Sequence, residues 1–474
     1  MRFTPASLPA VAAAAVIAAI TFLVTPTAMQ AQAPAPTTST PPRTEAARPA
    51  TIEVPYRQFR LANGLNVILH RDASVPIATV NIWYHVGSAN ERRGRTGFAH
   101  LFEHLMFEGS GHVKEGEFDT LLEGAGGNNN GSTTNDRTNY VIDVPANALE
   151  MALFLESDRM GYLLESMSPE RVNGQRDVVK NERRQSYENQ PYGMASIELD
   201  KMLWPADHPY SWPTIGYMED LTAASYDDVV QFFKTYYAPN NASLVVAGDI
   251  DLDAARKLVE KWFGEVPKGA DVMPIAPPAA RLTTVKRQTM TDRVRLPRLY
   301  LAWLSPKMFA PGDAALDILA SVLAGGKNSR LYKRLVYDMQ IAQDVSAYQS
   351  SGALGSSFQI VATARPGHTA AEMQKVIDEE IEKVKGQTPE AREVQRALNQ
   401  TEASFYRRME RVGGFYGKAD QLNAYYAAGG DPDFFAEDLA RYSSISASDV
   451  QSVALEFLPA DRRVELVVEP EAAK

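Results

Sequence analysis

The sequence contains no cysteine among its 474 residues. This absence excludes disulfide bonds, thiolate metal sites, cysteine nucleophiles and the lipid-modified cysteine of a lipoprotein. Core packing alone must therefore stabilise the folded chain. Any metal ion must be held by histidine, aspartate or glutamate, and the sequence has only seven histidines.

Positive charge is also in deficit. The 48 Lys and Arg residues are outnumbered by 58 Asp and Glu residues, which gives a formal net charge of −10. This balance argues against a general nucleic-acid binder and against attachment to an anionic membrane surface. Hydrophobic residues make up 45% and charged residues 22%, as in soluble globular proteins. A chain of this length exceeds one core of usual size, so we expect two or more domains.

Long hydrophobic runs are absent except near the N-terminus. An apolar, Ala-rich run from Leu8 to Val24 follows Arg2 and is itself followed by small residues. We interpret residues 1–33 as a secretory signal peptide. The alternative is an uncleaved anchor helix, for which the run is barely long enough. Residues 34–51, rich in Pro and Thr, are predicted to be a disordered tether.

The leader predicts where the protein resides. We expect an exported protein in the periplasm of a double-membrane bacterium, without stable membrane insertion once the signal peptide is cleaved. Secretion and membrane tethering are the alternatives.

Residue patterns predict an N-terminal α+β domain over residues 52–266. The run from Phe59 to Leu69, with Asn63-Gly64 at its centre, is typical of a β-hairpin. The Gly/Asn-rich segment 126–134 is interpreted as a turn that feeds the next strand. The other expected elements are strands at 77–86, 140–144 and 244–248, and helices from near 96 and at 116–123, 147–160, 169–187 and 225–236.

The second part of the chain repeats this order. Residues 267–281 are rich in Pro and are predicted to be a linker to a C-terminal α+β domain, 282–474. The helix, Pro turn and strand at 446–468 resemble those at 225–246. We therefore predict two homologous α/β-sandwich domains, each with a mixed, mainly antiparallel sheet and helices packed on one face. The further elements expected are strands at 298–304 and 358–364 and a helix at 312–323.

The most informative residues are His100, Glu103 and His104. On an α-helix, at 100° per residue, they fall within roughly one third of the circumference, opposite an apolar face. Two histidines at i and i+4 can bring their ring nitrogens onto one tetrahedral zinc, and the glutamate can then reach the water on that metal. The motif is the inverse of H-E-x-x-H. The alternative is a chance histidine pair on an amphipathic helix, which the scarcity of histidine disfavours.

A hydrolytic zinc site requires a third protein ligand and a position left open for water. The helix predicted at 169–187 offers Glu182, and Glu188 is the competitor. Spacing alone does not decide between the two glutamates.

The run from Gly94 to Gly109, which contains the histidine motif, resembles the inverzincin signature of the pitrilysin family. That family includes insulin-degrading enzymes and the mitochondrial processing peptidases. The resemblance covers the chain from about Ile52 to the C-terminus, and it is strongest at the zinc site. Further matching positions are Asp177–Arg184, Glu123, Gly126, Gly127, Asn130, Thr133, Thr138 and Tyr140.

The resemblance implies a fold and a mechanism. Two copies of an α+β domain would form a half-enzyme, and two halves would close as a clamshell around a peptide chamber. Zn2+ would be held by His100, His104 and Glu182. Glu103 would be the general base that takes a proton from zinc-bound water as it attacks the peptide carbonyl.

The resemblance also implies a substrate-binding edge, to which an extended peptide would add as a strand. The alternative at this segment is a structural Gly/Asn turn. The residues concerned are Asn130, Gly131, Ser132 and Thr133.

Two positions depart from the family pattern. Many members carry an extra Glu seven residues before the third ligand, where this chain has Gln175, which can donate a hydrogen bond but cannot take a proton. Members also carry an Arg and a Tyr that grip the substrate opposite the zinc, and the corresponding places here hold Val336 and Gln343. The resemblance therefore implies a second family subunit, in a hetero- or homodimer, that supplies this grip.

These residues together predict a zinc metalloendopeptidase that acts on unfolded or short peptides. A non-catalytic scaffold subunit is one alternative, but a scaffold needs no complete set of metal ligands and base. A module that binds extended peptides without cutting them is the other, and zinc occupancy without turnover would favour it.

Overall fold

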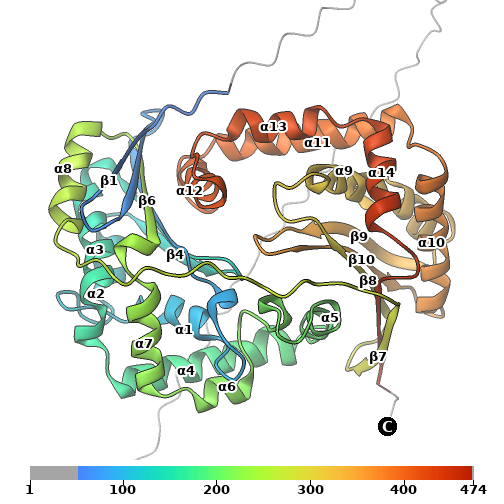
Figure 1. Cartoon of the computed structure of the whole chain (residues 1–474), viewed down its shortest axis with the longest axis horizontal. Coiled ribbons are helices and arrows are strands. Elements are labelled where there is room, and N and C mark those ends of the chain that lie inside the picture. Colours follow the sequence, from blue (N-terminus) through green and yellow to red (C-terminus); the bar gives the residue numbers. More distant parts are fainter. Residues whose placement is uncertain (1–51, 472–474) are drawn as a thin grey trace, which may run out of the picture. The chain divides into compact units, whose positions relative to one another are not determined.

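The computed structural model describes residues 52–471. The predicted signal peptide (1–33) and tether (34–51) lie outside the described residues. Within the described part of the chain, no helix is both long and apolar enough to cross a membrane. The chain forms two β-sheets with many helices (Figure 1). The predicted α+β class is confirmed.

The first sheet has six strands in the order β1-β2-β6-β3-β5-β4. Its strands are β1 (Arg57–Arg60), β2 (Asn66–Arg71), β3 (Ile77–Tyr84), β4 (Asn128–Thr133), β5 (Thr138–Pro145) and β6 (Ala242–Gly248). The helices of this half are α1 (Phe98–Leu105), α2 (Glu117–Gly124), α3 (Leu149–Ser166), α4 (Pro169–Arg183), α5 (Ala195–Leu203), α6 (Met218–Ala223), α7 (Tyr226–Tyr236) and α8 (Leu252–Phe263).

The second sheet has five strands in the order β7-β11-β8-β10-β9. Its strands are β7 (Lys286–Asp292), β8 (Arg298–Ser305), β9 (Ala342–Ser350), β10 (Ser356–Ala364) and β11 (Val464–Pro470). The helices of this half are α9 (Asp313–Ala324), α10 (Ala370–Gly386), α11 (Ala391–Met409), α12 (Lys418–Gly429), α13 (Phe435–Ser443) and α14 (Ala447–Phe457).

The two sheets share one topology. β2 pairs in parallel with β6, and β3 lies antiparallel between β6 and β5, with β4 at the edge. β7, β11, β8, β10 and β9 repeat this pattern with the same strand directions. The repeated helix before the last strand begins with a capping box in both halves, at Ser225 in α7 and at Ser446 in α14. The duplication that the sequence predicts is thus visible in the topology.

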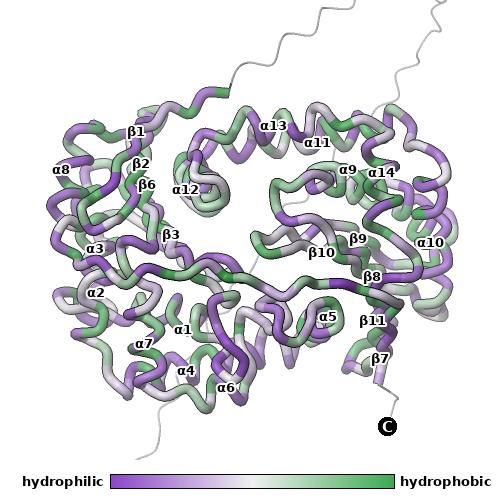
Figure 2. The backbone as a smooth tube through the Cα atoms, viewed as in Figure 1, coloured by the Kyte–Doolittle hydropathy of each residue, from purple (hydrophilic) through white to green (hydrophobic). Residues whose placement is uncertain are grey.

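Each half packs its own helices on one face of its sheet. In the first half, alternate residues of β3 and β5 point into a core shared with α1, α3, α7 and α8. In the second half, β8 and β10 do the same with α9, α10, α11 and α14. The period-2 alternation of strand side chains produces this arrangement. In Figure 2 the edge strand β7 is largely hydrophilic, in keeping with its exposed, polar residues.

The opposite face of each sheet is covered by a helix from the other half. α12 packs on β6 and β3, where Ala419 and Leu422 meet Val245 and Ala247. α5 packs on the equivalent strands β11 and β8 of the second sheet. Because α5 and α12 occupy the same place in the repeat, the two halves exchange equivalent helices.

Three sequence expectations need correction. Segment 126–134 is not simply a turn, because Asn128–Thr133 forms β4 and pairs antiparallel with β5. The sequence missed β7 and β9, which carry many exposed polar residues and lack the apolar runs of central strands. The helix expected at 147–160 runs on to Ser166. Residues 267–283, which include the predicted linker, contain no helix or strand.

Candidate active site

α1 presents the histidine motif on one side and buries the other. Leu101, Phe102 and Leu105 have no exposed surface. Gly97 begins the helix with φ +89°, and a Cβ there would lie 2.9 Å from the Cα of Gly216, so glycine is required on both counts. Glu91 anchors this first turn, because its carboxylate accepts hydrogen bonds from the backbone N–H groups of residues 97 and 99.

The third side chain comes from α4, which packs beside α1 (Figure 1). Ser168 caps α4, Pro169 occupies its first turn, and Glu182 lies near its end. Glu182 Oε2 lies 3.2 Å from His104 Nε2 and 3.7 Å from His100 Nε2. The atoms through which the three residues could bind a metal ion all lie within 4.8 Å of one another.

This donor set fits a zinc ion. Two imidazoles and one carboxylate are the protein ligands of a common class of hydrolytic zinc sites. Burial lowers the pKa of His100 to about 4, so its ring is neutral at pH 7 and can offer a nitrogen lone pair to a metal. The Nε2 atom of His100 faces Glu182. Its Nδ1 atom is buried without a hydrogen-bond partner.

Glu103 lies against the edge strand β4. Thr133 Oγ1 donates a 2.5 Å hydrogen bond to Glu103 Oε2. Burial raises the pKa of Glu103, and the Thr133 hydroxyl and His104 oppose that rise. A Cβ at Gly131 would lie 3.0 Å from Glu103 Cγ and 3.2 Å from Phe107. Glycine at this position therefore lets the carboxylate pack directly on the strand.

The hydrogen-bond pattern of β4 shows which backbone groups face outward. Thr134 N donates to Arg137 O at 2.9 Å and closes the β4–β5 turn. Since hydrogen-bonded pairs alternate in an antiparallel ladder, Asn130 and Ser132 bond to β5. The N–H and C=O groups of Gly131 and Thr133 then point away from β5, toward the free edge of the sheet.

Side chains already form hydrogen bonds with several residues of β4. Asn130 Oδ1 accepts the N–H of Gly131 at 2.9 Å. Ser132 Oγ donates to Asn139 Oδ1 at 2.7 Å, and Arg137 Nη1 donates to the carbonyl of Ser132 at 2.8 Å. The four predicted substrate-binding residues thus lie on an edge strand, and their contacts to substrate stay a prediction.

The remaining sequence candidates lie apart from the three donor atoms. Glu188 forms an ion pair with Arg183 at 3.2 Å and is not part of the cluster. Gln175, two turns before Glu182, donates to Glu108 Oε1 at 2.6 Å. In the second half, Val336 is buried in the core and Gln343 is exposed on β9.

Sequence reasoning did not foresee three contacts around the candidate site. Thr133 was predicted to bind substrate, which stays a prediction, and its hydroxyl also donates to Glu103. Neither Arg137 nor Glu91 was singled out. A Thr in a strand, an Arg in a turn and a Glu before a helix are each common, and no sequence signal marks them because their partners are set by strand pairing and helix packing.

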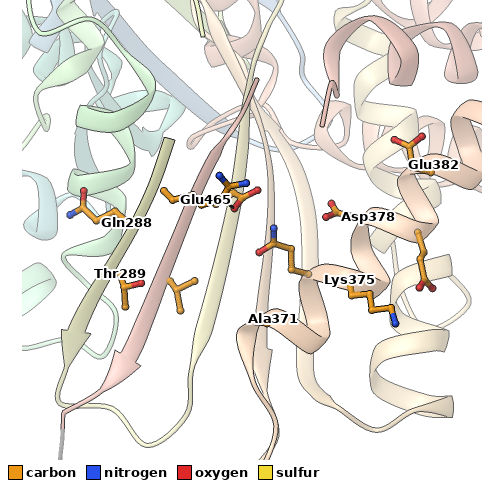
Figure 3. A pocket seen from close by; sticks show the side chains of 11 residues that line it. Gln288, Thr289, Ala371, Lys375, Asp378, Glu382 and Glu465 are labelled. Atoms are coloured by element: carbon orange, nitrogen blue, oxygen red, sulfur yellow. Dashed lines mark hydrogen bonds and ion pairs between the residues drawn. The ribbon is translucent and has the colours of Figure 1, made fainter. Parts of the chain in front are cut away.

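A surface cavity of about 860 Å³ lies elsewhere, between β7, β11 and α10 (Figure 3). Its acidic groups are already paired. Asp378 accepts from Arg463, and Glu465 accepts from both Arg287 and Arg463. The cavity contains none of the predicted site residues, so it is not the candidate active site.

Comparison with known proteins places the chain in a family. The family model described as Insulinase (Peptidase family M16) matches residues 66–200, and the Peptidase M16 inactive domain matches 223–401. The zinc protease PqqE of Helicobacter pylori is 30% identical over 425 residues, which are 88% of this chain and 93% of that protein. This chain belongs to peptidase family M16.

Further relatives agree. An uncharacterized zinc protease of Streptomyces coelicolor is 26% identical to the M16 chain over 413 residues, 85% of this chain and 87% of that one. The crystal structure of a protease from Helicobacter pylori superimposes with a TM-score of 0.82 at 27% identity, over 88% of this chain and 100% of the other. The pitrilysin-type resemblance is confirmed. All three candidate metal ligands of this M16 chain lie in the segment that the Insulinase model matches.

Proposed function

We propose that this M16 chain is a zinc metalloendopeptidase that hydrolyses peptide bonds in unfolded or short peptides. The observation that carries the proposal is that potential ligand atoms of His100, His104 and Glu182 lie within 4.8 Å of one another. Glu103 lies on α1 with the two histidines. The zinc proteases among its relatives support the same reading. A scaffold subunit has no need of this complete set.

In this proposal the three side chains hold zinc. A bound zinc ion supplies Lewis-acid polarisation of the scissile carbonyl and lowers the pKa of water. His100 and His104 contribute imidazoles from one helix face, and Glu182 contributes a carboxylate from α4. The ligands come from two packed helices, so their spacing is fixed by the core beneath α1 rather than by flexible loops.

Glu103 acts as the general base. Its Oε2 atom accepts a hydrogen bond from the Thr133 hydroxyl. Oε1 is therefore the oxygen available to take a proton from the attacking water. The same oxygen can return the proton to the leaving amine, as general acid–base catalysis requires. Packing against Gly131 limits the rotamers that Glu103 can adopt.

The edge of β4 binds the peptide as an added strand. The outward-facing N–H and C=O groups of Gly131 and Thr133 can pair with an extended substrate backbone beside Glu103. The Asn130 side chain that now engages the Gly131 N–H gives way to a substrate carbonyl. Backbone pairing of this kind favours unfolded or short peptides, because a folded chain has few free edges.

We also propose that a second family subunit completes the enzyme, since Val336 and Gln343 cannot form the basic and aromatic grip. The subunit can be another chain or a second copy. The protein acts in the periplasm after cleavage of residues 1–33. Cell fractionation and N-terminal sequencing of the mature protein test this location; a cytoplasmic chain that retains Met1 would contradict it.

The decisive experiment is hydrolysis of an unstructured, fluorescence-quenched peptide by the purified chain. The control is Glu103→Gln, which keeps an oxygen to accept from Thr133 but cannot take the proton. We expect chelator-sensitive cleavage by the wild type and none by the variant. If the chain binds zinc but does not cut, candidate family subunits are added. Zinc binding with no cleavage under either condition would refute the peptidase and favour a peptide-binding module.

A further inference from the structure

The face of the first sheet that lies away from α1 carries two fully buried amides, Asn81 on β3 and Asn139 on β5. A buried amide without a hydrogen-bond partner is destabilising. The amide nitrogens of both residues donate to one acceptor from the second half of the chain. Asp420 Oδ1 accepts from Asn139 Nδ2 at 2.9 Å and from Asn81 Nδ2 at 3.2 Å.

Asp420 is fully engaged at the start of α12. Its Oδ1 atom also accepts from the indole Nε1 of Trp83 at 2.9 Å. Its Oδ2 atom accepts from the backbone N–H of Tyr416 at 2.8 Å. One turn later, Asn423 donates to the side chain of Asn81 at 2.7 Å. Asp420 is 5% exposed, so these donors, rather than water, provide the hydrogen bonds to its carboxyl oxygens.

The contact continues to the edge strand. Asn139 is paired in register with Ser132 of β4. Ser132 Oγ donates to Asn139 Oδ1 at 2.7 Å, while the amide nitrogen of Asn139 donates to Asp420. Asp420 and Ser132 thus hold the two ends of one amide and fix its orientation. The carbonyl of Ser132 also accepts from Arg137, whose guanidinium lies 5.0 Å above the Trp83 ring.

We infer that Asp420 is a positioning residue for the substrate-binding edge, acting from the second half of the chain through Asn139 and Ser132. The inference rests on the proposed function, in which β4 receives the peptide. Ser132 lies between Gly131 and Thr133, the residues whose backbone faces outward beside Glu103. Holding Ser132 in place therefore aligns the peptide-pairing groups with the general base. The second half, which supplies none of the three proposed zinc ligands, contributes to the site in this way.

Peptide binding to the full chain in the Glu103→Gln background tests the inference without turnover. Asp420→Ala removes all four hydrogen bonds to the carboxylate. We expect its Kd for a fluorescent unstructured peptide to rise about tenfold or more, as loss of hydrogen bonds to a charged group implies. Bound zinc should be unchanged. Deuterium uptake of segment 128–133 should increase, while that of the central strand β6 should not.

A matched control separates positioning from loss of stability. Asp438 is another buried aspartate of the second half, and it accepts from Tyr425 and Arg441 rather than from the first sheet. Asp438→Ala should lower Tm and leave the peptide Kd within twofold. If Asp420→Ala does not fold, Asn139→Ala replaces it, because this change removes the amide that Asp420 and Ser132 both contact and leaves the Asn81 and Trp83 contacts to Asp420 in place.

A double-mutant cycle with Ser132→Ala tests the route. If Asp420 acts through Asn139 and Ser132, Asp420→Ala should change the Kd less than threefold once Ser132 is alanine. Two results would overturn the inference. One is that the two substitutions change the Kd by independent factors that multiply in the double variant. The other is that deuterium uptake of segment 128–133 is unchanged in a folded Asp420→Ala variant. If the chain binds no peptide at all, the proposed function fails, and the exchange of 128–133 still decides whether Asp420 orders the edge.

Discussion

Replacing Thr133 by valine removes the hydroxyl that donates a 2.5 Å hydrogen bond to Glu103 Oε2. Valine has nearly the same shape as threonine and suits a strand, so β4 and its backbone pairing should persist. The change therefore isolates one contact to the proposed general base. Without it, the pKa of Glu103 should rise further, because burial already raises that pKa and the Thr133 hydroxyl opposes the rise. The carboxylate also loses the group that holds it in one orientation.

The expected magnitude follows from the chemistry of the bond. A hydrogen bond to a charged group contributes about 1.5–3 kcal/mol, and each 1.4 kcal/mol corresponds to about tenfold in rate. If the bond acts fully in the transition state, kcat should fall about 10- to 100-fold. KM should change little, because the substrate-facing backbone of β4 is unaltered.

The assay is steady-state hydrolysis of a quenched peptide by wild type, Thr133→Val and Thr133→Ser, with zinc content measured on each sample. Thr133→Ser restores the hydroxyl and should recover most of the lost kcat. Two results would refute the reasoning: a Thr133→Val enzyme with wild-type kcat, or a Thr133→Ser enzyme as slow as the valine variant. Loss of zinc from Thr133→Val would instead show that the residue supports the metal ligands.

Three further predictions concern metal binding, pH and stability. Glu182→Gln should lower zinc affinity at least about tenfold, while Glu188→Gln should not. Metal analysis after dialysis against a weak chelator measures the zinc that each variant retains. Equal zinc loss in both variants would contradict the ligand assignment. Burial raises the pKa of Asp200 to about 7, above its value in the unfolded chain, so this residue should contribute stability below pH 4 that is lost as pH rises to 7. Asp200→Asn should flatten that part of the urea-midpoint profile against pH, and an unchanged slope would show that Asp200 is not responsible. Arg159 and Glu156 form a fully buried ion pair, so Arg159→Met should destabilise the chain by about 3–5 kcal/mol in urea unfolding. This loss of stability should be smaller when Glu156→Gln is added. A loss below about 1 kcal/mol, as for a surface ion pair, would refute the prediction.

Much of the site could be predicted because its signal is local. The spacing of His100, Glu103 and His104 fixes their common helix face, whatever the rest of the chain does. Glu182 could be named by family resemblance, but spacing alone left Glu188 open. The structure separates them, because Glu188 is the last residue of a π-helical turn that follows α4 and pairs with Arg183.

The fold was predictable where apolar patterns were strong. The hairpin around Gly64, the buried strand β6 and the capped helices α7 and α14 lie where local signals place them. β4 was harder, since an Asn/Gly-rich segment has low strand propensity. It is a strand because β5 offers it a complete ladder of partners.

The sequence by itself determined the chemistry available to this protein: no thiols, a histidine pair with a glutamate on one helix face, and a duplicated α+β chain. These follow from composition and from periodicities that span a few residues. Only the tertiary structure decided that Thr133 bonds to Glu103, that α5 and α12 cover each other's sheets, and that Asp420 reaches Asn139. The contacts of Thr133 with Glu103 and of Asp420 with Asn139 join residues 30 and 281 positions apart. Such partners are determined by sheet register and helix packing, which no local pattern encodes.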